Sequence, residues 1–149
     1  MKTKIIAILS ILLVFTSQVS AALIRISSVD VIPGQPLNTD FITFNISGTA
    51  PESGAQVVDN QFSQNGTSLQ LDLYVQTGQA QVPSQWTYSK QIEPLAVNNY
   101  TLEVRTFWYG PNTLEDTHTT DFTVVPEPGT LVLLSLGLPI LRAFSRRKG

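Results

Sequence analysis

Residues 69–75, LQLDLYV, alternate without interruption between apolar side chains and polar or amphipathic ones. A period of two places Leu69, Leu71, Leu73 and Val75 on one face of an extended strand and the other side chains on the opposite face. Such a pattern is typical of an antiparallel sheet that packs one side on a core and exposes the other side to water.

The same alternation recurs along the middle of the chain, and turn-forming residues separate the runs. Apolar or inward positions alternate at Ile42, Phe44, Ile46; at Tyr100, Leu102, Val104; and at Thr120, Phe122, Val124. The sequences PGQP at 33–36, PESG at 51–54 and GPN at 110–112 are turn signals. The dipeptide Asn65-Gly66 predicts a type I′ hairpin with positive φ at both central residues. We therefore expect seven strands, near residues 23–31, 40–48, 55–63, 67–76, 85–92, 99–109 and 117–125.

Seven short strands at intervals of about 10–15 residues favour a single antiparallel β-sandwich. The loop at 33–36 with Asp40, and Leu95 followed by YTLEV at 100–104, resemble parts of an immunoglobulin-like or fibronectin III-like domain. The resemblance implies that the hydroxyl of Tyr100 bonds back to the upstream backbone. The chain has no cysteine, so we expect Trp86 or Trp108 to fill the core where such domains often have a disulfide.

The first residues have the pattern of an export signal. Lys2 and Lys4 precede an apolar stretch at residues 5–15, and the small residues of VSA at 19–21 provide a cleavage site before Ala22. This order predicts a signal peptide over residues 1–21, with the Sec translocon and signal peptidase as partners. The folded domain is then expected over residues 22–124.

The last 25 residues, 125–149, form a second recognisable segment. The prolines of Pro126-Glu127-Pro128 end the preceding strand, because neither can donate a backbone hydrogen bond. An apolar stretch follows at residues 129–141; as a helix it spans about 20 Å, which is short of the roughly 30 Å of a bilayer core. A basic cluster then ends the chain and fits retention of this end in the cytoplasm: Arg142, Arg146, Arg147 and Lys148.

These three elements, in this order at the C-terminus, resemble the PEP-CTERM sorting signal. The resemblance covers residues 125–149 and implies a Gram-negative bacterium that makes exopolysaccharide. It also implies exosortase, a membrane-embedded cysteine protease, as the processing partner, with Pro126, Glu127 and Pro128 as the recognition residues. The main alternative is a plain uncleaved membrane anchor. A GPI signal would end apolar, and the Leu-Pro-x-Thr-Gly motif of a sortase signal is absent from the sequence.

Charge is distributed unevenly between the signals and the body. Residues 22–127 carry three basic and eleven acidic side chains, a net charge of −8, although the whole chain has −2. A body this acidic repels nucleic acid and anionic lipid. The lack of cysteine excludes thiol catalysis, cysteine-ligated zinc and disulfides.

Candidate catalytic and metal-binding residues are few. His118 is the only histidine, and we interpret it as a solvated residue near a hairpin; a calcium site at Glu115, Asp116 and Asp121 is the alternative, without a supporting loop motif. No Gly-x-Ser-x-Gly motif occurs, and the carboxylates are scattered singly. We therefore predict no enzyme activity, no metal and no cofactor.

The best candidate for ligand contact is the aromatic run at residues 107–109. Alternation turns Trp108 toward the core and Phe107 and Tyr109 outward, on the face of Arg105. An exposed aromatic pair can mark a binding patch, so Phe107 and Tyr109 are a candidate platform for sugars; packing at a sheet edge is the alternative.

Together these features predict an exported, non-enzymatic protein of the cell surface or extracellular matrix. We expect it to be held transiently at the inner membrane by its C-terminal helix and then to act as a structural or adhesive part of an exopolysaccharide biofilm. The second hypothesis is a carbohydrate-binding module that recognises exopolysaccharide, and a small hydrolase is a remote third.

Overall fold

A computed structural model describes residues 23–129, which fold into seven β-strands and no long helix. The predicted signal peptide at 1–21 and residues 130–149 of the predicted sorting signal lie outside the described residues. The strands are β1 (Arg25–Ile32), β2 (Ile42–Ala50), β3 (Gln56–Asn65), β4 (Ser68–Gln76), β5 (Ser84–Ile92), β6 (Asn98–Trp108) and β7 (Thr113–Val124).

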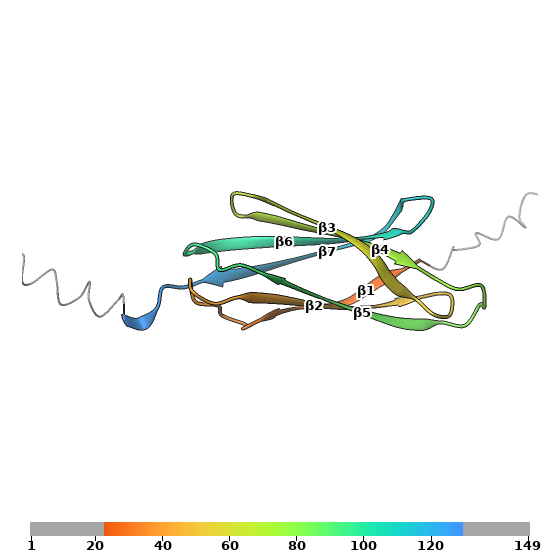
Figure 1. The fold of residues 1–149 in the computed structure, drawn as a ribbon, viewed down its shortest axis with the longest axis horizontal. Helices are drawn as coiled ribbons and strands as arrows, with labels where there is room; N and C mark the ends of the chain where they lie inside the picture. The colour runs from red at the N-terminus through yellow and green to blue at the C-terminus, as the bar shows by residue number, and fades with distance from the viewer. Residues whose placement is uncertain (1–22, 130–149) are drawn as a thin grey trace, which may run out of the picture.

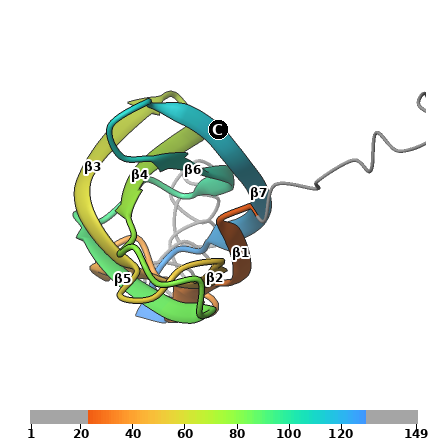
Figure 2. The same cartoon turned by 90° about the vertical axis from the view of Figure 1, so that its right-hand side faces the viewer.

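The strands form two packed sheets, as a sandwich requires (Figures 1 and 2). One sheet has the order β1-β2-β5 and the other β3-β4-β6-β7. Along the open sides of the sandwich, β1 contacts β7 and β3 contacts β5. The prediction of an all-β sandwich is therefore confirmed at this level.

One strand pair departs from the expected antiparallel arrangement. Strands β4 and β6 pair in parallel, with Leu71 opposite Val104, whereas all other neighbours are antiparallel. After β4 the chain crosses to the other sheet as β5 and then returns to the first sheet as β6. The chain reverses its direction at each crossing, so β6 runs in the same direction as β4. Immunoglobulin domains build both sheets from antiparallel strands, so this pair is a difference from that fold.

The predicted strands match the observed ones to within two residues, except at the start of β7. That strand begins at Thr113 instead of the expected residue 117, because the β6–β7 turn is short and Trp108 already pairs with Thr113. Positive φ angles at Gly110 (107°) and Asn112 (55°) close this turn. A register shift between Thr106 and Phe107 interrupts the regular alternation along this strand pair.

The hairpin at Asn65-Gly66 forms, but its predicted turn type is wrong. Asn65 pairs with Ser68, so the two central residues are Gly66 and Thr67. Gly66 has a φ of 60°, and within residues 23–129 the only non-glycine residue with positive φ is Asn112. Positive φ at the first central position alone is the pattern of a type II′ turn. A β-branched threonine at the second position disfavours the positive φ that type I′ requires.

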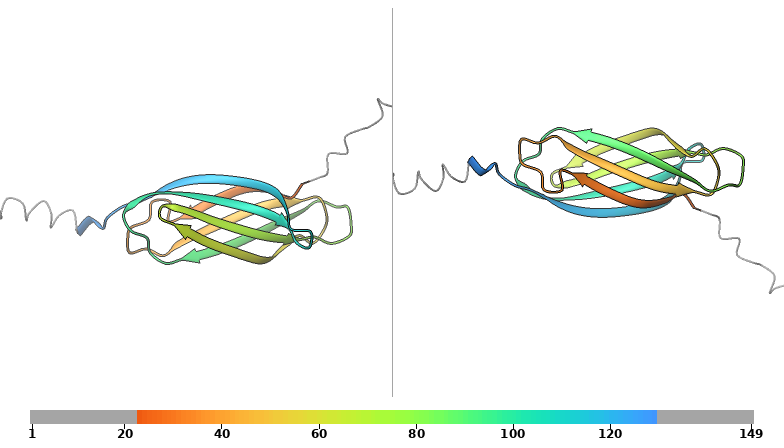
Figure 3. Two further views of the ribbon diagram at one scale, coloured as in Figure 1. Left: turned by 90° about the horizontal axis from the view of Figure 1, so that it is seen from above. Right: turned by 90° about the horizontal axis from the view of Figure 1, so that it is seen from below.

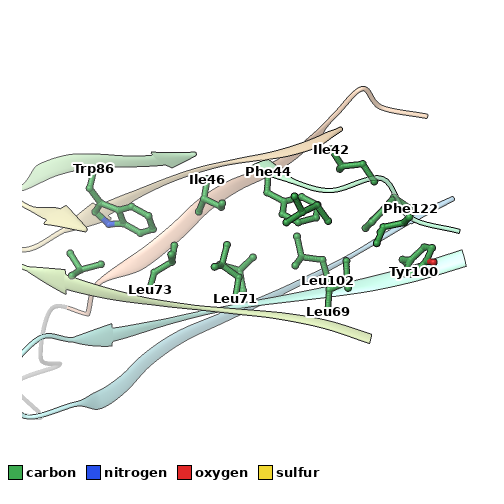
Figure 4. Close-up of a cluster of buried hydrophobic side chains, with 14 of the residues drawn as sticks. Ile42, Phe44, Ile46, Leu69, Leu71, Leu73, Trp86, Tyr100, Leu102 and Phe122 are labelled. Atoms are coloured by element: carbon green, nitrogen blue, oxygen red, sulfur yellow. The ribbon is translucent and has the colours of Figure 1, made fainter. Parts of the chain in front are cut away.

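The core lies between the sheets and is made of the inward residues that alternation predicted (Figure 4). The inward residues of β2, β4 and β6 are buried: Ile42, Phe44, Ile46, Leu69, Leu71, Leu73, Val75, Tyr100, Leu102 and Val104. Phe122 of β7 joins them, with its ring centroid 5.9 Å from that of Phe44 and 5.6 Å from that of Tyr100. Trp86 is buried in the core, whereas Trp108 is partly buried and packs against the core. Trp86 is therefore the tryptophan that fills the core.

The predicted tyrosine corner is present at the start of β6. The Tyr100 hydroxyl donates a hydrogen bond of 3.0 Å to the backbone oxygen of Ala96, four residues upstream. Leu95 is buried beside it. This contact fixes the crossing from β5 to β6 and is shared with immunoglobulin-like domains.

Candidate functional site

The described chain leaves the sandwich through a contact between two segments that are far apart in sequence. Val125 donates to the Pro36 backbone oxygen at 3.0 Å, and Asn38 donates its N–H to the Val125 oxygen at 3.0 Å. The backbone N–H of Glu127 donates to Asn38 Oδ1 at 3.2 Å. We call this contact, made by Pro36, Leu37, Asn38, Val125 and Glu127, the tail clasp.

The composition of both segments explains why the clasp takes this form. Pro126 and Pro128 have no N–H, so in residues 125–128 only Val125 and Glu127 can donate, and both do. On the other side, Asp40 shapes the loop: its Oδ2 accepts from the Leu37 N–H at 2.8 Å, and its own N–H donates to the Leu37 oxygen at 3.0 Å. The proposed recognition residues therefore begin while the chain is still bound to the domain.

The clasp and the start of the described chain lie at opposite ends of the sandwich (Figures 1 and 3). Strand β7 has 12 residues, about 40 Å of extended chain, between its hairpin with β6 and the clasp. Pro126 and Glu127 are half-buried at this end and Pro128 is exposed. The basic cluster of Arg142, Arg146, Arg147 and Lys148 falls outside the described residues.

The second candidate site lies on the outer face of the four-stranded sheet, near the end away from the clasp. Four residues align across its strands in register: Asp59 opposite Tyr74, Tyr74 opposite Phe107, and Phe107 opposite Leu114. The Tyr74 and Phe107 rings are stacked, with centroids 5.3 Å apart and an angle of 23° between planes. We call the stacked pair of Tyr74 and Phe107 the aromatic row; the aliphatic Leu114 lies beside Phe107 on β7.

Phe107 and Tyr109, the pair predicted from the sequence, are not a stacked pair. Tyr109 lies just beyond β6, is half exposed, and donates its backbone N–H to the Val75 oxygen at 2.9 Å. The aromatic partner of Phe107 is Tyr74, which sequence reasoning missed. Its outward position could be read from the alternation at 69–75, but its neighbour depends on the non-local pairing of β4 with β6.

A charged pair lies beside the aromatic row. Arg105 Nε and Nη2 donate to the two carboxylate oxygens of Asp72 at 2.8 and 2.6 Å, and the guanidinium carbon lies 5.4 Å from the Phe107 ring centroid. The hydrogen bond to Asp72 raises the pKa of Arg105 further above its usual value, and burial opposes this. Arg105 points outward, as expected, but it is bound to Asp72 and packed on Phe107.

The residues of the alternative calcium site do not converge. Asp116 accepts from the backbone N–H of Ile26 at 2.8 Å and so joins β7 to β1, whereas Asp121 accepts from the Thr101 hydroxyl at 2.6 Å. Across residues 23–129 no group of three or more acidic or histidine side chains is placed to hold a metal ion. His118 lies within the β6–β7 hairpin opposite Val104 and is half-buried, so it is only partly solvated.

The outer face of the three-stranded sheet is hydroxyl-rich and carries a shallow groove of about 350 Å³. Ser28 and Ser47 hydrogen-bond to each other at 2.8 Å, and the Ser89 hydroxyl donates to Asn45 Oδ1 at 2.8 Å. The Ser28 hydroxyl also donates to the carboxylate of Asp30, which lines the groove, at 3.5 Å. The groove therefore presents hydroxyl, amide and carboxylate groups to solvent.

No helix within residues 23–129 has the length and apolar character needed to cross a membrane. Comparisons of the chain with protein-family models, curated proteins and solved structures find no match.

Proposed function

We propose that this chain is an exported, non-enzymatic protein that a PEP-CTERM/exosortase-type system sorts to the cell surface or extracellular matrix. There the acidic sandwich serves as a structural or adhesive part of an exopolysaccharide biofilm. The observation that carries the proposal is the ordered tail of Pro126-Glu127-Pro128, apolar stretch and basic cluster. The clasp supports it, because the chain passes directly from the folded domain into this segment.

The geometry also suits display of the domain at a surface. Because the tail leaves at one end, a protein held by its tail presents the β6–β7 hairpin about 40 Å away. The net charge of −8 over residues 22–127 keeps such domains soluble and apart from one another. We also propose that the sandwich is immunoglobulin-like; the Tyr100–Ala96 corner supports this, and the parallel β4–β6 pair is its main difference.

Export of the full chain by a Gram-negative host that carries an exosortase tests the sorting proposal. Three forms are compared: the natural chain, a chain without residues 125–149, and a Glu127→Ala variant. This substitution keeps the clasp intact, because the clasp uses only the backbone N–H of Glu127. We expect mass spectrometry to show loss of the tail from the natural chain alone. If all three forms localise alike and the natural and Glu127→Ala chains both keep the mass of the uncleaved tail, sorting by this motif is excluded.

The second candidate function is carbohydrate binding, and the Tyr74–Phe107 stack is the observation that favours it. Aromatic side chains supply apolar contact area, while the adjacent Asp72–Arg105 pair offers polar groups to hydroxyls. Asp59, Asp72 and Glu103 outnumber Arg105 here, so a neutral glycan fits better than an acidic one. The site lies at the end of the sandwich away from the clasp, where a matrix polymer can reach it.

A glycan-binding screen with the purified protein tests this candidate. We expect Tyr74→Ala and Phe107→Ala to weaken binding and Tyr109→Ala to weaken it less, because Tyr109 is outside the stack. Phe41→Ala is the matched control, since it removes an exposed aromatic ring at the opposite end of the sandwich. Failure of the natural protein to bind any glycan, or equal binding by all four variants, rules this function out.

A further inference from the structure

Three large apolar side chains are exposed where the tail leaves the sandwich. Ile32 at the end of β1 is 49% exposed, Phe41 just before β2 is 59% exposed, and Val97 just before β6 is 50% exposed. None of them belongs to the core cluster. We call these three residues the clasp-end apolar residues.

Strand register places these residues around the point where the tail leaves. Asn98 pairs with Val124, so Val97 precedes β6 at the level where Val125 follows β7. On the other side of Val125, Leu37 forms an isolated parallel bridge with it. Ile32 and Phe41 stand at the two ends of the loop that contains Leu37. The departing chain is therefore flanked from both sides by segments that expose apolar residues.

The clasp limits how far this end can move from the tail. The last clasp contact is the Glu127 N–H on Asn38 Oδ1. Only two residues separate Glu127 from residue 130, and the apolar stretch continues to residue 141. Three residue steps reach at most about 10 Å even when fully extended. If the apolar stretch enters a bilayer at residue 130, Glu127 and the Asn38 contact that holds it must then lie within about this distance of the bilayer surface.

We propose that this end of the sandwich is a membrane-contacting surface, with Ile32, Phe41 and Val97 resting in the interfacial layer of a zwitterionic bilayer. The proposal rests on the proposed function, because it requires the tail to enter the membrane. Apolar and aromatic side chains gain free energy by leaving water for the interfacial region. The clasp keeps the clasp-end apolar residues facing the lipid, so the long axis of the sandwich points away from the bilayer surface.

Charge decides the kind of lipid surface. Glu93 and Glu127 lie close to the clasp-end residues in sequence and fold, and the body as a whole is strongly acidic. An anionic leaflet repels such a surface. A zwitterionic bilayer leaves the apolar contact without this opposition, so we commit to it.

Apolar side chains are also exposed at the end of the sandwich opposite the clasp, and they provide a matched control for the membrane-contacting surface. Val82, Tyr109 and Leu114 are 59%, 49% and 55% exposed, and all lie toward the opposite end. They match Val97, Phe41 and Ile32 in size and type. The two sets differ mainly in their distance from the tail.

The absence of cysteine from the chain allows site-specific labelling without other changes. Single variants Ile32→Cys, Phe41→Cys, Val97→Cys, Val82→Cys, Tyr109→Cys and Leu114→Cys carry a fluorophore at an exposed position. A Ser135→Cys variant reports on the tail itself. Each chain begins at Ala22, which leaves every described strand in place, and is reconstituted into phosphatidylcholine vesicles with a nitroxide quencher on the lipid.

We expect lipid quenching of the label at residues 135, 32, 41 and 97, with little quenching at 82, 109 and 114. Circular dichroism confirms the fold of each variant. Three positions are labelled at each end, so the two ends can still be compared if one variant does not fold. If residue 135 is quenched while the two ends of the sandwich are quenched equally, or not at all, the membrane-contacting surface is wrong and the proposed sorting survives. If residue 135 is not quenched, the tail does not insert and both proposals fall.

Discussion

Trp86 occupies the space in which a side chain at Gly48 would stand. The two residues are partners in the register between β5 and β2. A Cβ atom placed on Gly48 would overlap the Trp86 ring and the backbone oxygen of Arg25. The indole is buried and its Nε1 has no hydrogen-bond partner. The indole therefore fills the space beside Gly48 although its N–H is unpaired, and this arrangement requires glycine on the neighbouring strand.

Gly48→Ala should destabilise the domain markedly. The added methyl group must displace the Trp86 ring and the β1 backbone, and overpacking of this kind costs about 1–3 kcal/mol. Urea unfolding followed by tryptophan fluorescence measures the shift of the midpoint. Gly34→Ala is the control, because a Cβ there meets nothing within 4 Å. Equal midpoints for the two variants would show that the indole does not press on Gly48.

Tyr100→Phe isolates the hydrogen bond of the tyrosine corner. The substitution removes the 3.0 Å bond from the hydroxyl to the Ala96 oxygen and keeps the ring that stacks on Phe122. We expect a loss of about 1 kcal/mol in the free energy of unfolding. Tyr109→Phe, at a half-exposed residue outside the core, should change stability little. A Tyr100→Phe protein as stable as the natural one would mean that the corner does not contribute.

Local patterns in this sequence predict β2, β4 and β6 well because each of these strands buries one face in the core. The inward residues of β2 and β4 alternate with polar ones, so burial follows directly from the period of two. The Asn65-Gly66 dipeptide predicts the turn one residue too early, because Asn65 is still paired with Ser68 in the β3–β4 ladder and only Gly66 has a positive φ. A dipeptide signal shows that a turn is present but not which residues are central.

Relations between distant strands could not be predicted, and the candidate site depends on them. The parallel pairing of β4 with β6 brings Tyr74 against Phe107, and nothing in either strand specifies that neighbour. The clasp is likewise a meeting of residues 36–38 with residues 125–127. Alternation gives the face of each side chain, whereas the order of strands in a sheet follows from the path of the whole chain.

Arg105→Ala should destabilise the domain more than Asp72→Ala does. The Asp72 carboxylate is nearly buried, whereas the Arg105 side chain is partly exposed and can reach water when unpaired. Loss of the arginine leaves a buried acceptor charge with only the Gln70 amide, 3.3 Å away, as a partner. An unsatisfied buried group costs about 1–3 kcal/mol, more than an exposed ion pair contributes. Chemical denaturation of both variants gives the order, and a larger loss for Asp72→Ala would contradict this account.

Stability should fall at alkaline pH partly because of Tyr88. Burial, with a smaller effect of Asp59, raises the pKa of Tyr88 in the folded protein. The unfolded chain then loses this proton first, so the contribution is complete below a pH of about 10 and declines as pH rises from the unfolded pKa through the folded one. Tyr88→Phe removes this titration. Denaturation midpoints of both proteins between neutral and alkaline pH should diverge; parallel curves would exclude Tyr88.

Asn38→Ala should loosen one half of the tail clasp and leave the other half in place. The substitution removes the acceptor of the Glu127 N–H, whereas the Val125 N–H keeps the Pro36 backbone oxygen. Hydrogen exchange read by NMR should therefore accelerate at the Glu127 amide by about fivefold, which corresponds to a bond of about 1 kcal/mol. The Val125 amide should keep its protection.

Asn99→Ala is the control for this clasp variant. Asn99 lies at the same end of the sandwich and accepts from the Thr123 hydroxyl at 2.7 Å, but it makes no contact in the clasp. Its replacement should leave exchange at Glu127 unchanged. If Asn38→Ala also leaves that rate unchanged, the Asn38 side chain does not hold the tail, and the domain is free to pivot about Val125. In that case the upright orientation on the membrane would depend on the Val125 contacts alone.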